Sequence, residues 1–196
     1  MSVARVLGIN VAMNMVRSFS TQPPPRGFSA IELMVVMSIM AILTALAAPA
    51  FSEMIARYKT SVMADQLVSL LTVARTEAIR RGGNVILSKK TSGINDCSTN
   101  QKWSCGVTLW ADDDRDGTQD ANEPVLRDFD VPEGIVLNNN TGATPAARII
   151  LNRWGQANGI NALAFSLVHT SISSANRSVC VASGGRIRVV EGVTCP

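Results

Sequence analysis

The sequence has few of the residues on which most enzymes depend. Its 196 residues include one histidine, one tyrosine and 5% aromatic residues in total. It has no nucleophile elbow, no phosphate-cradling loop and no catalytic arrangement of a nucleophile with a base. The one histidine, His169, falls in an apolar strand pattern, which favours a structural role. We therefore expect a protein that is not an enzyme and that requires no cofactor.

Cysteine is also scarce. The four cysteines fall as two close pairs, Cys97 with Cys105 and Cys180 with Cys195. Neither pair has CxxC spacing and there is only one histidine, so a zinc site is the weaker alternative. An even number of cysteines in an exported domain predicts two disulfides that close short loops, each contributing about 2–3 kcal/mol.

The chain has little net charge, because 18 basic and 15 acidic residues leave a formal charge of +3. Three of the basic residues, Arg5, Arg17 and Arg26, lie near the N-terminus, and the rest of the chain is neutral. The charges are still unevenly spread, with five basic and ten acidic residues over 82–133 but five arginines and one glutamate over 134–196. The last third is therefore a candidate cationic surface.

Residues 33–52, by contrast, form an apolar run of 20 residues without a charge. About 20 apolar residues are enough to cross the roughly 30 Å hydrocarbon core of a bilayer as a helix. Glu32 lies at the edge of this run, where a carboxylate is costly in lipid unless it has a positively charged partner. The basic residues before the run predict a cytoplasmic N-terminus, with everything after Phe51 on the outside.

The junction ahead of the run resembles the type IV prepilin processing site, because Arg26-Gly27 precedes Phe28 and Glu32 is the fifth residue after the glycine. The resemblance implies that prepilin peptidase cuts between Gly27 and Phe28 and methylates the new Phe28 amine. It also implies that Glu32 neutralises the methylated amine of a neighbouring subunit during filament assembly. Pro49 lies where these proteins usually carry a helix-kinking proline. The alternative is a plain signal anchor in which Glu32 is incidental.

This interpretation divides the chain into four parts. Residues 1–27 are a leader removed by the peptidase, with Met1, Met13 and Met15 all open as the true start. Residues 28–52 form the transmembrane and assembly helix, 53–82 its amphipathic continuation, and 83–196 one β-rich periplasmic domain.

The continuation is amphipathic, since apolar residues recur at three- and four-residue steps at Met63, Leu67, Leu70, Ala74 and Ala78. Two glycines at 82–83 end the helix after two arginines. Beyond them the period shortens towards two, which predicts strands at 84–88, 106–111, 125–129, 135–137, 148–152, 162–168, 178–182 and 186–190. The fold class is α+β, with a long N-terminal transmembrane and amphipathic helix packed on an antiparallel β-sheet domain, as in pilins.

The segment ARTEAIRRGGNVIL, residues 74–87, resembles a block of the GspH/FimT family of minor pilins and pseudopilins. The resemblance implies a single-pass precursor in a bacterial inner membrane, with its C-terminal domain in the periplasm. It also implies that the partners are other pilin or pseudopilin subunits, in a filament that reaches the cell surface.

The segment DDDRDGTQDANE has the spacing of a calcium-binding EF-hand loop, with Asp112, Asp114 and Asp116 at alternate positions, followed by Gly117 and Glu123. Alternate carboxylates converge on one ion when the loop winds round it, and Glu123 can donate two oxygens. Strands rather than helices are predicted on both sides, and the segment also looks like an Asp-rich turn of the GspH/FimT family that requires no metal. A calcium site and a solvated turn stabilised by its own aspartates therefore both stay open.

Near the C-terminus, Arg186 and Arg188 alternate with Ile187 in the segment GGRIRVV. On a strand both guanidinium groups project from one face, where they can bind successive phosphates in a salt-dependent and sequence-independent manner. The four residues GRIR resemble the GRxR motif of FimT-like minor pilins, which implies DNA as a ligand during natural transformation. The alternative is an edge strand whose arginines keep it soluble. Further arginines that could extend the surface are Arg148, Arg153 and Arg177.

Two functions compete within this family. One is a DNA-binding minor pilin of a type IV pilus, and the other is a GspH-like tip subunit of a type II secretion pseudopilus that does not bind DNA. A hypothesis from another class is a membrane-anchored calcium-binding domain that forms no filament.

Overall fold

The computed structural model describes residues 27–142, 146–157 and 162–196. The predicted leader, apart from Gly27, lies outside the described residues, and so do Arg26 and the three candidate start methionines Met1, Met13 and Met15. The chain divides into two compact units, Met1–Ile42 and Leu43–Pro196.

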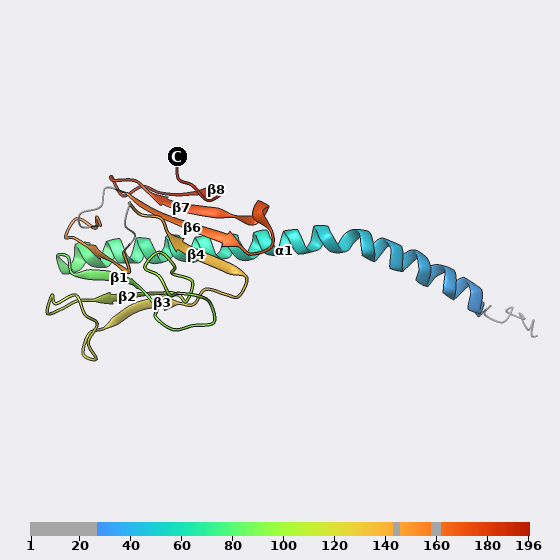
Figure 1. Cartoon of the computed structure of the whole chain (residues 1–196), viewed down its shortest axis with the longest axis horizontal. Helices are drawn as coiled ribbons and strands as arrows, with labels where there is room; N and C mark the ends of the chain where they lie inside the picture. The colour runs from blue at the N-terminus through green and yellow to red at the C-terminus, as the bar shows by residue number, and fades with distance from the viewer. Residues whose placement is uncertain (1–26, 143–145, 158–161) are drawn as a thin grey trace, which may run out of the picture. The chain divides into compact units, whose positions relative to one another are not determined.

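One helix, α1 (Ala30–Arg81), is 52 residues long and continues from the first unit into the second (Figure 1). It contains no glycine, which would lower its helix propensity, and its one proline is Pro49. Pro49 removes one backbone donor without ending the helix. The hydroxyl of Ser52 donates a hydrogen bond of 2.8 Å to the Pro49 carbonyl in the turn that follows.

The C-terminal end of α1 is set by Gly82 and Gly83, which have φ angles of 74° and 109°. The N–H of Gly83 donates to the Ala78 carbonyl at 2.7 Å, and the N–H of Gly82 donates to the Ile79 carbonyl at 3.4 Å. This pair of bonds is a Schellman motif, which satisfies carbonyls at the end of a helix and favours glycine because φ is positive. The predicted end of the helix is confirmed.

Within the described residues, eight strands follow and form two antiparallel sheets of four strands each, both in the second unit. The first sheet has the order β3-β2-β1-β5, with bounds Val125–Phe129, Val107–Ala111, Val85–Lys89 and Arg148–Leu151. The second has the order β4-β6-β7-β8, with bounds Ile135–Asn139, Leu163–His169, Arg177–Val181 and Ile187–Glu191. A short 3₁₀ helix, η1 (Ser173–Ala175), connects β6 to β7. The predicted α+β class and all eight strands are confirmed, whereas the division into two sheets was not predicted.

The core of the second unit lies between α1 and the two sheets. The five apolar residues predicted to form one face of the helix are all buried, and Leu67 is 0% exposed. They belong to one cluster with side chains from both sheets, such as Leu109 of β2 and Phe165 of β6. Trp103 packs edge-on against Phe165, with 5.4 Å between ring centroids. Each fully buried leucine contributes about 1.5–3 kcal/mol, so this face fixes the helix to both sheets.

Two disulfides close short loops, and both pair as predicted. Cys97 is bonded to Cys105 and Cys180 to Cys195, with Cα–Cα distances of 5.6 Å and 5.8 Å. All four cysteines are within the described residues, and none is free. Because oxidised sulfurs cannot act as thiolate ligands, the structure does not support the zinc alternative.

Candidate functional site

Three parts of the described chain carry the residues singled out by the sequence. They are the N-terminal half of α1, the loop between β2 and β3, and the hairpin between β7 and β8. Each is built differently, and each offers different chemistry.

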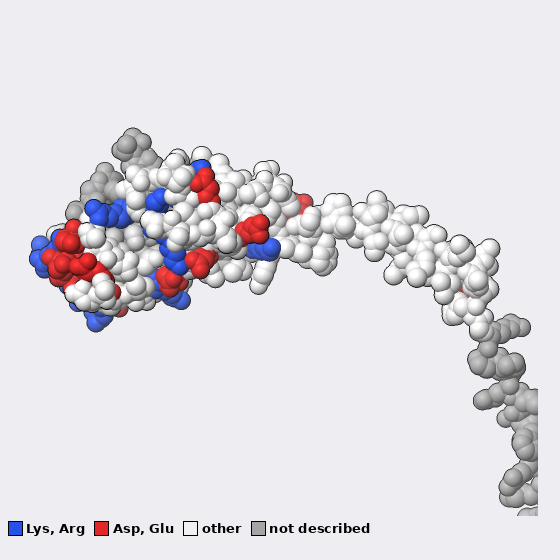
Figure 2. Space-filling view, turned by 60° about the horizontal axis from the view of Figure 1, so that its bottom comes forward, with Lys and Arg blue, Asp and Glu red and all other residues white. Residues whose placement is uncertain are grey.

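The N-terminal half of α1 exposes its apolar side chains. Exposed large apolar residues there include Ile31, Leu33, Met37, Leu43 and Phe51. The most apolar stretch of the helix has a mean hydropathy of 2.3, and none of it is buried against other described residues. In Figure 2 this part of the chain shows almost no Lys, Arg, Asp or Glu surface. The helix is long and apolar enough to cross a membrane, and soluble monomers rarely expose an apolar patch of this size.

Glu32 is in the first turn of α1 and is exposed. Its backbone N–H donates to the Ser29 hydroxyl at 3.2 Å, so Ser29 caps the helix. Ser29 and Glu32 have the S-x-x-E spacing of a capping box, a signal that our sequence analysis missed. Among the described residues no Lys or Arg forms an ion pair with Glu32.

The bond between Gly27 and Phe28 lies before the first helical residue, Ala30. Phe28 is 79% exposed, and Gly27 has no other atom within 4 Å of where a Cβ would lie. A peptide bond outside a helix and free of packing is open to an enzyme without local unfolding. Among the described residues, Gly27 and Phe28 are both exposed and lie outside the helix.

Glu53 marks the point at which α1 meets the globular part of the second unit. Its Oε1 accepts hydrogen bonds from the Ser174 hydroxyl in η1 at 2.6 Å and from Arg57 at 2.7 Å. The Ser174 hydroxyl, followed by the Arg57 guanidinium, lowers the pKa of Glu53. The first buried helix residue, Ala56, follows three positions later. Glu53 is thus the first residue of the predicted amphipathic continuation, 53–82, and it contacts η1.

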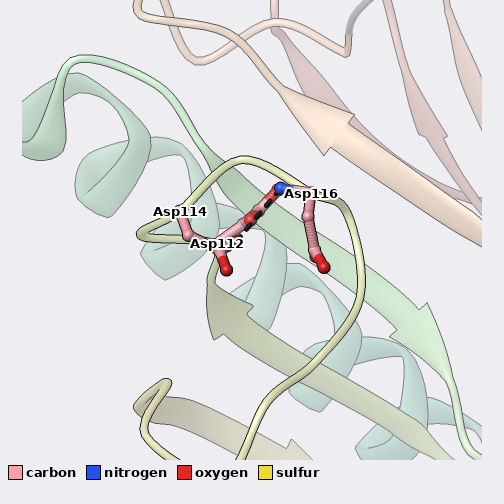
Figure 3. A group of neighbouring side chains, drawn as sticks. All are labelled: Asp112, Asp114 and Asp116. Atoms are coloured by element: carbon pink, nitrogen blue, oxygen red, sulfur yellow. Dashed lines mark hydrogen bonds between the residues drawn. The ribbon is translucent and has the colours of Figure 1, made fainter.

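The loop between β2 and β3 brings Asp112, Asp114 and Asp116 together (Figure 3). One carboxylate oxygen from each lies within 4.8 Å of the others. Asp114 and Asp116 are exposed, whereas Asp112 is 4% exposed because it directly follows the buried end of β2. Burial raises the pKa of Asp112, and backbone N–H groups of Arg115 and Gly117 act in the opposite direction. The loop winds tightly, with positive φ at Arg115 (69°) and Gly117 (76°).

Glu123, which the EF-hand spacing assigns to the same ion, is not part of this group of three. It is 6% exposed, and its two oxygens accept the backbone N–H groups of Asp113 at 2.9 Å and Asp120 at 3.0 Å. Its carboxylate therefore closes the loop by holding its two ends together. Buried carboxylates are usually hydrogen-bonded, and here backbone N–H groups are the donors.

The hairpin between β7 and β8 carries Arg186 and Arg188, and both are exposed. Ile187 between them is half-buried and packs against the core, as the expected alternation requires. Strand β8 is the edge strand of its sheet, and the Ala182 N–H donates to the Arg186 carbonyl at 2.9 Å across the turn. Within the described ranges neither arginine forms an ion pair.

Arg75 of α1 fixes the tip of this hairpin. Its guanidinium donates a 2.7 Å hydrogen bond to the Gly185 carbonyl. A Cβ at Gly185, where φ is 79°, would lie 1.9 Å from the Arg75 guanidinium, and a Cβ at Gly155 would also meet Arg75. The positive φ favours glycine at this position of GRIR, and the Arg75 guanidinium would have to move to admit a Cβ, a contact that the sequence alone did not indicate.

The other arginines of the last third make different contacts from one another. Arg148 donates to the Gly117 carbonyl in the acidic loop, and Arg177 pairs with Glu191 at 3.3 Å. Arg153 instead lies over the ring of Trp154, 4.9 Å from its centroid, and Trp154 is 62% exposed. Two residues after Trp154, the side chain of Gln156 donates to the Ser183 carbonyl of the hairpin at 3.3 Å. An exposed tryptophan and a third arginine therefore lie on a loop that contacts the hairpin, a feature that the sequence analysis did not predict.

A long apolar helix whose second half packs on antiparallel sheets is the arrangement of a pilin-like protein. The model of the family described as type II transport protein GspH matches residues 63–185, which is more than half of the chain. The chain therefore belongs to the GspH family, as its sequence resemblance predicted.

Crystal structures of the type IV minor pilin FimU from Pseudomonas aeruginosa (strain PAO1) have a similar fold. One matches with a TM-score of 0.51 and 14% identity, covering 71% of this chain and 94% of that chain. A second crystal form gives a TM-score of 0.49 at the same identity, covering 69% and 96%. At this identity the likeness concerns the fold alone. No match was found among the curated proteins.

Proposed function

We propose that this protein is a minor pilin or pseudopilin subunit that is processed before Phe28 and enters a filament through the N-terminal half of α1. The observation that supports this most directly is the apolar surface of that half, which no described residue covers. A helix that is apolar on every side is stable only in lipid or among other helices. On entering a filament, the helix would move from lipid into contact with other helices.

In this mechanism the membrane holds the precursor until prepilin peptidase frees the Phe28 amine and methylates it. The amine is then a cation at the end of an apolar helix, and Glu32 of a neighbouring subunit is an anion in the same setting. A single unpaired charge is costly in a low-dielectric helix bundle. Pairing the amine with Glu32 therefore favours one axial offset between neighbouring subunits. Capping of the first turn by Ser29 holds that turn helical while Glu32 remains available.

Mass spectrometry of protein from its native cells tests the processing step. We expect an N-terminus at N-methylated Phe28. Native protein that retains residues 1–27 would contradict the proposal and favour a membrane-anchored domain that forms no filament.

Replacing Glu32 tests the assembly step. Glu32→Ala should be inserted and cleaved normally but should be at least tenfold depleted from purified filaments, because the amine loses its partner. Glu53→Gln is the matched control. It removes the charge of the glutamate that follows the apolar run, whereas Glu32 precedes the run. Equal incorporation of Glu32→Ala and wild type would remove the assigned role.

We further propose that the hairpin bearing Arg186 and Arg188 binds DNA. Both guanidinium groups are exposed and free of carboxylates among the described residues, and Trp154 with Arg153 lies on the neighbouring loop. Arginine forks bind successive phosphates, and an exposed indole is a platform on which a base can stack. The competing role is a tip subunit of a type II secretion pseudopilus whose arginines only protect the edge strand.

A gel-shift titration separates these two roles. Changing Arg186 and Arg188 to Gln should weaken DNA binding and should reduce the salt dependence by about 0.7–0.9 per lost phosphate contact. Lys59→Gln with Arg80→Gln removes the same charge from α1 and should have little effect. If both double variants bind like wild type, or if wild type does not bind, the secretion role is favoured.

A further inference from the structure

One atom of the acidic loop has no explanation in the fold. The Oδ1 of Asp112 is buried and has no hydrogen-bond partner among the described residues, while its Oδ2 accepts the Gly117 N–H at 3.1 Å. Buried polar atoms are almost always paired, and an unpaired anionic oxygen is among the costliest exceptions. Asp112 as a whole residue is 4% exposed and its Oδ1 is itself buried, so bulk water does not supply the missing partner.

The same aspartate belongs to the group of three carboxylates in this loop. Oxygens of Asp112, Asp114 and Asp116 lie within 4.8 Å of one another, so three like charges converge. Like charges at this distance repel unless a cation lies between them. Within the described residues no Lys or Arg forms an ion pair with any of the three. Arg81 pairs with Asp113 instead, at 3.4 Å.

We propose that this loop binds one calcium ion through the carboxylates of Asp112, Asp114 and Asp116, with Asp112 Oδ1 as the innermost ligand. Calcium takes oxygen ligands at about 2.3–2.6 Å, so two ligands on opposite sides of the ion are about 4.6–5.2 Å apart. Because the three oxygens all lie within 4.8 Å of one another, one ion can contact all of them. The side chains also occupy alternate positions of one loop, and Gly117 provides the turn that lets them converge.

The site differs from an EF-hand in two ways that set its affinity. It lies between strands β2 and β3 rather than between helices, and Glu123 uses both oxygens to hold backbone N–H groups. Three carboxylates leave several of the six to eight calcium positions to carbonyls and water. We therefore expect a Kd in the range of extracellular modules, about 10⁻⁴–10⁻³ M.

Bound calcium would rigidify the connection between β2 and β3. Gly117 of this loop contacts Arg148 of β5 through its carbonyl, so the ion would also stabilise a link between the loop and the other edge of the first sheet. This inference does not depend on the filament or on DNA binding.

Calorimetric titration of the full chain in detergent with CaCl₂, after removal of metal by a chelator, tests the site. We expect saturable binding of one ion per chain and a rise in Tm of about 3–6 °C at calcium tenfold above Kd. MgCl₂ should bind at least tenfold more weakly, because magnesium requires a smaller and more regular ligand shell. Absence of both heat and a Tm shift at 10-fold the expected Kd would overturn the proposal.

Asparagine variants identify the ligands. Asp112→Asn should weaken calcium binding at least tenfold, and Asp114→Asn and Asp116→Asn should each weaken it about threefold or more. Asp113→Asn is the control, because it removes a carboxylate of the same loop that is outside the group of three; its affinity should stay within twofold of wild type. If Asp112→Asn does not fold, the calcium affinities of Asp114→Asn and Asp116→Asn still test the proposal. Equal effects of all four variants would mean that calcium responds only to the net charge of the loop.

Discussion

The two halves of α1 have the same secondary structure but opposite relations to their surroundings. Leu43 in the first half is 56% exposed, whereas Leu67 in the second half is 0% exposed. The first half is apolar on all sides and its most apolar stretch is not buried by any described residue, while the second is apolar on one side only and packs on two sheets. Backbone hydrogen bonds form the helix in both halves, but the distribution of apolar residues determines what must cover each half.

The largest effect should come from truncating equivalent leucines in the two halves. Leu67→Ala should reduce the free energy of unfolding of the globular part by about 2–5 kcal/mol, because it leaves a cavity in the core. Leu43→Ala should change it by less than about 0.5 kcal/mol, since no core contact is lost. Denaturant unfolding of the full chain in detergent, followed by tryptophan fluorescence, measures both. Similar losses for the two variants would contradict the division of α1.

Removing the second disulfide should have the next largest effect. The double change Cys180→Ser with Cys195→Ser opens a loop with a sequence separation of 15 and should lower stability by about 2–3 kcal/mol. The helical signal of the first half should persist, since none of its most apolar stretch is buried against other described residues. Thermal unfolding monitored by circular dichroism distinguishes loss of the β-rich part from loss of helix. Unchanged stability would show that the loop is held by packing alone.

Adjacent glycines in the hairpin should respond very differently. Gly185→Ala should cost about 1–3 kcal/mol, because φ is 79° there and the new methyl group would overlap the Arg75 guanidinium. Gly184→Ala should be nearly neutral, since nothing lies within 4 Å of the added Cβ. Chemical denaturation of the two variants side by side measures the difference. Restoration of stability by combining Gly185→Ala with Arg75→Ala would identify the overlap as its cause.

The smallest effect concerns the boundary between the halves. The pKa of Glu53 is below its ordinary value of 4.5, so the folded state binds fewer protons there than the unfolded state. Its contact with Ser174 therefore stabilises the fold above about pH 4.5 and is lost as the pH falls through the folded pKa. Ser174→Ala should thus be slightly less stable than wild type at pH 6, and the difference should shrink at pH 3. A constant difference between Tm values across this range would exclude the titration of Glu53 as its source.

The parts of the fold that could be predicted from the sequence are those set by local patterns. The helix was predicted by the spacing of its buried residues, and its end by Gly82 and Gly83. The eight strands were predicted by their period and turn residues, to within two residues at each end. Their assignment to two sheets could not be predicted, because it depends on pairings such as β1 with β5, between which three other strands lie in the sequence.

The candidate sites show the same limit. The spacing of Asp112, Asp114 and Asp116 is local, and the structure does bring them together. The engagement of Glu123 by backbone N–H groups depends on how the loop closes, which the EF-hand spacing does not reveal. The bond from Arg75 to Gly185 joins residues that are 110 positions apart, so no short motif could contain it.

That bond also has a practical use in protein engineering. Arg75 holds the hairpin at Gly185, and the neighbouring Gly184 is exposed with nothing within 4 Å of an added Cβ. A short peptide epitope inserted between Ser183 and Gly184 would be displayed outward, while the bond from Arg75 keeps strands β7 and β8 in register.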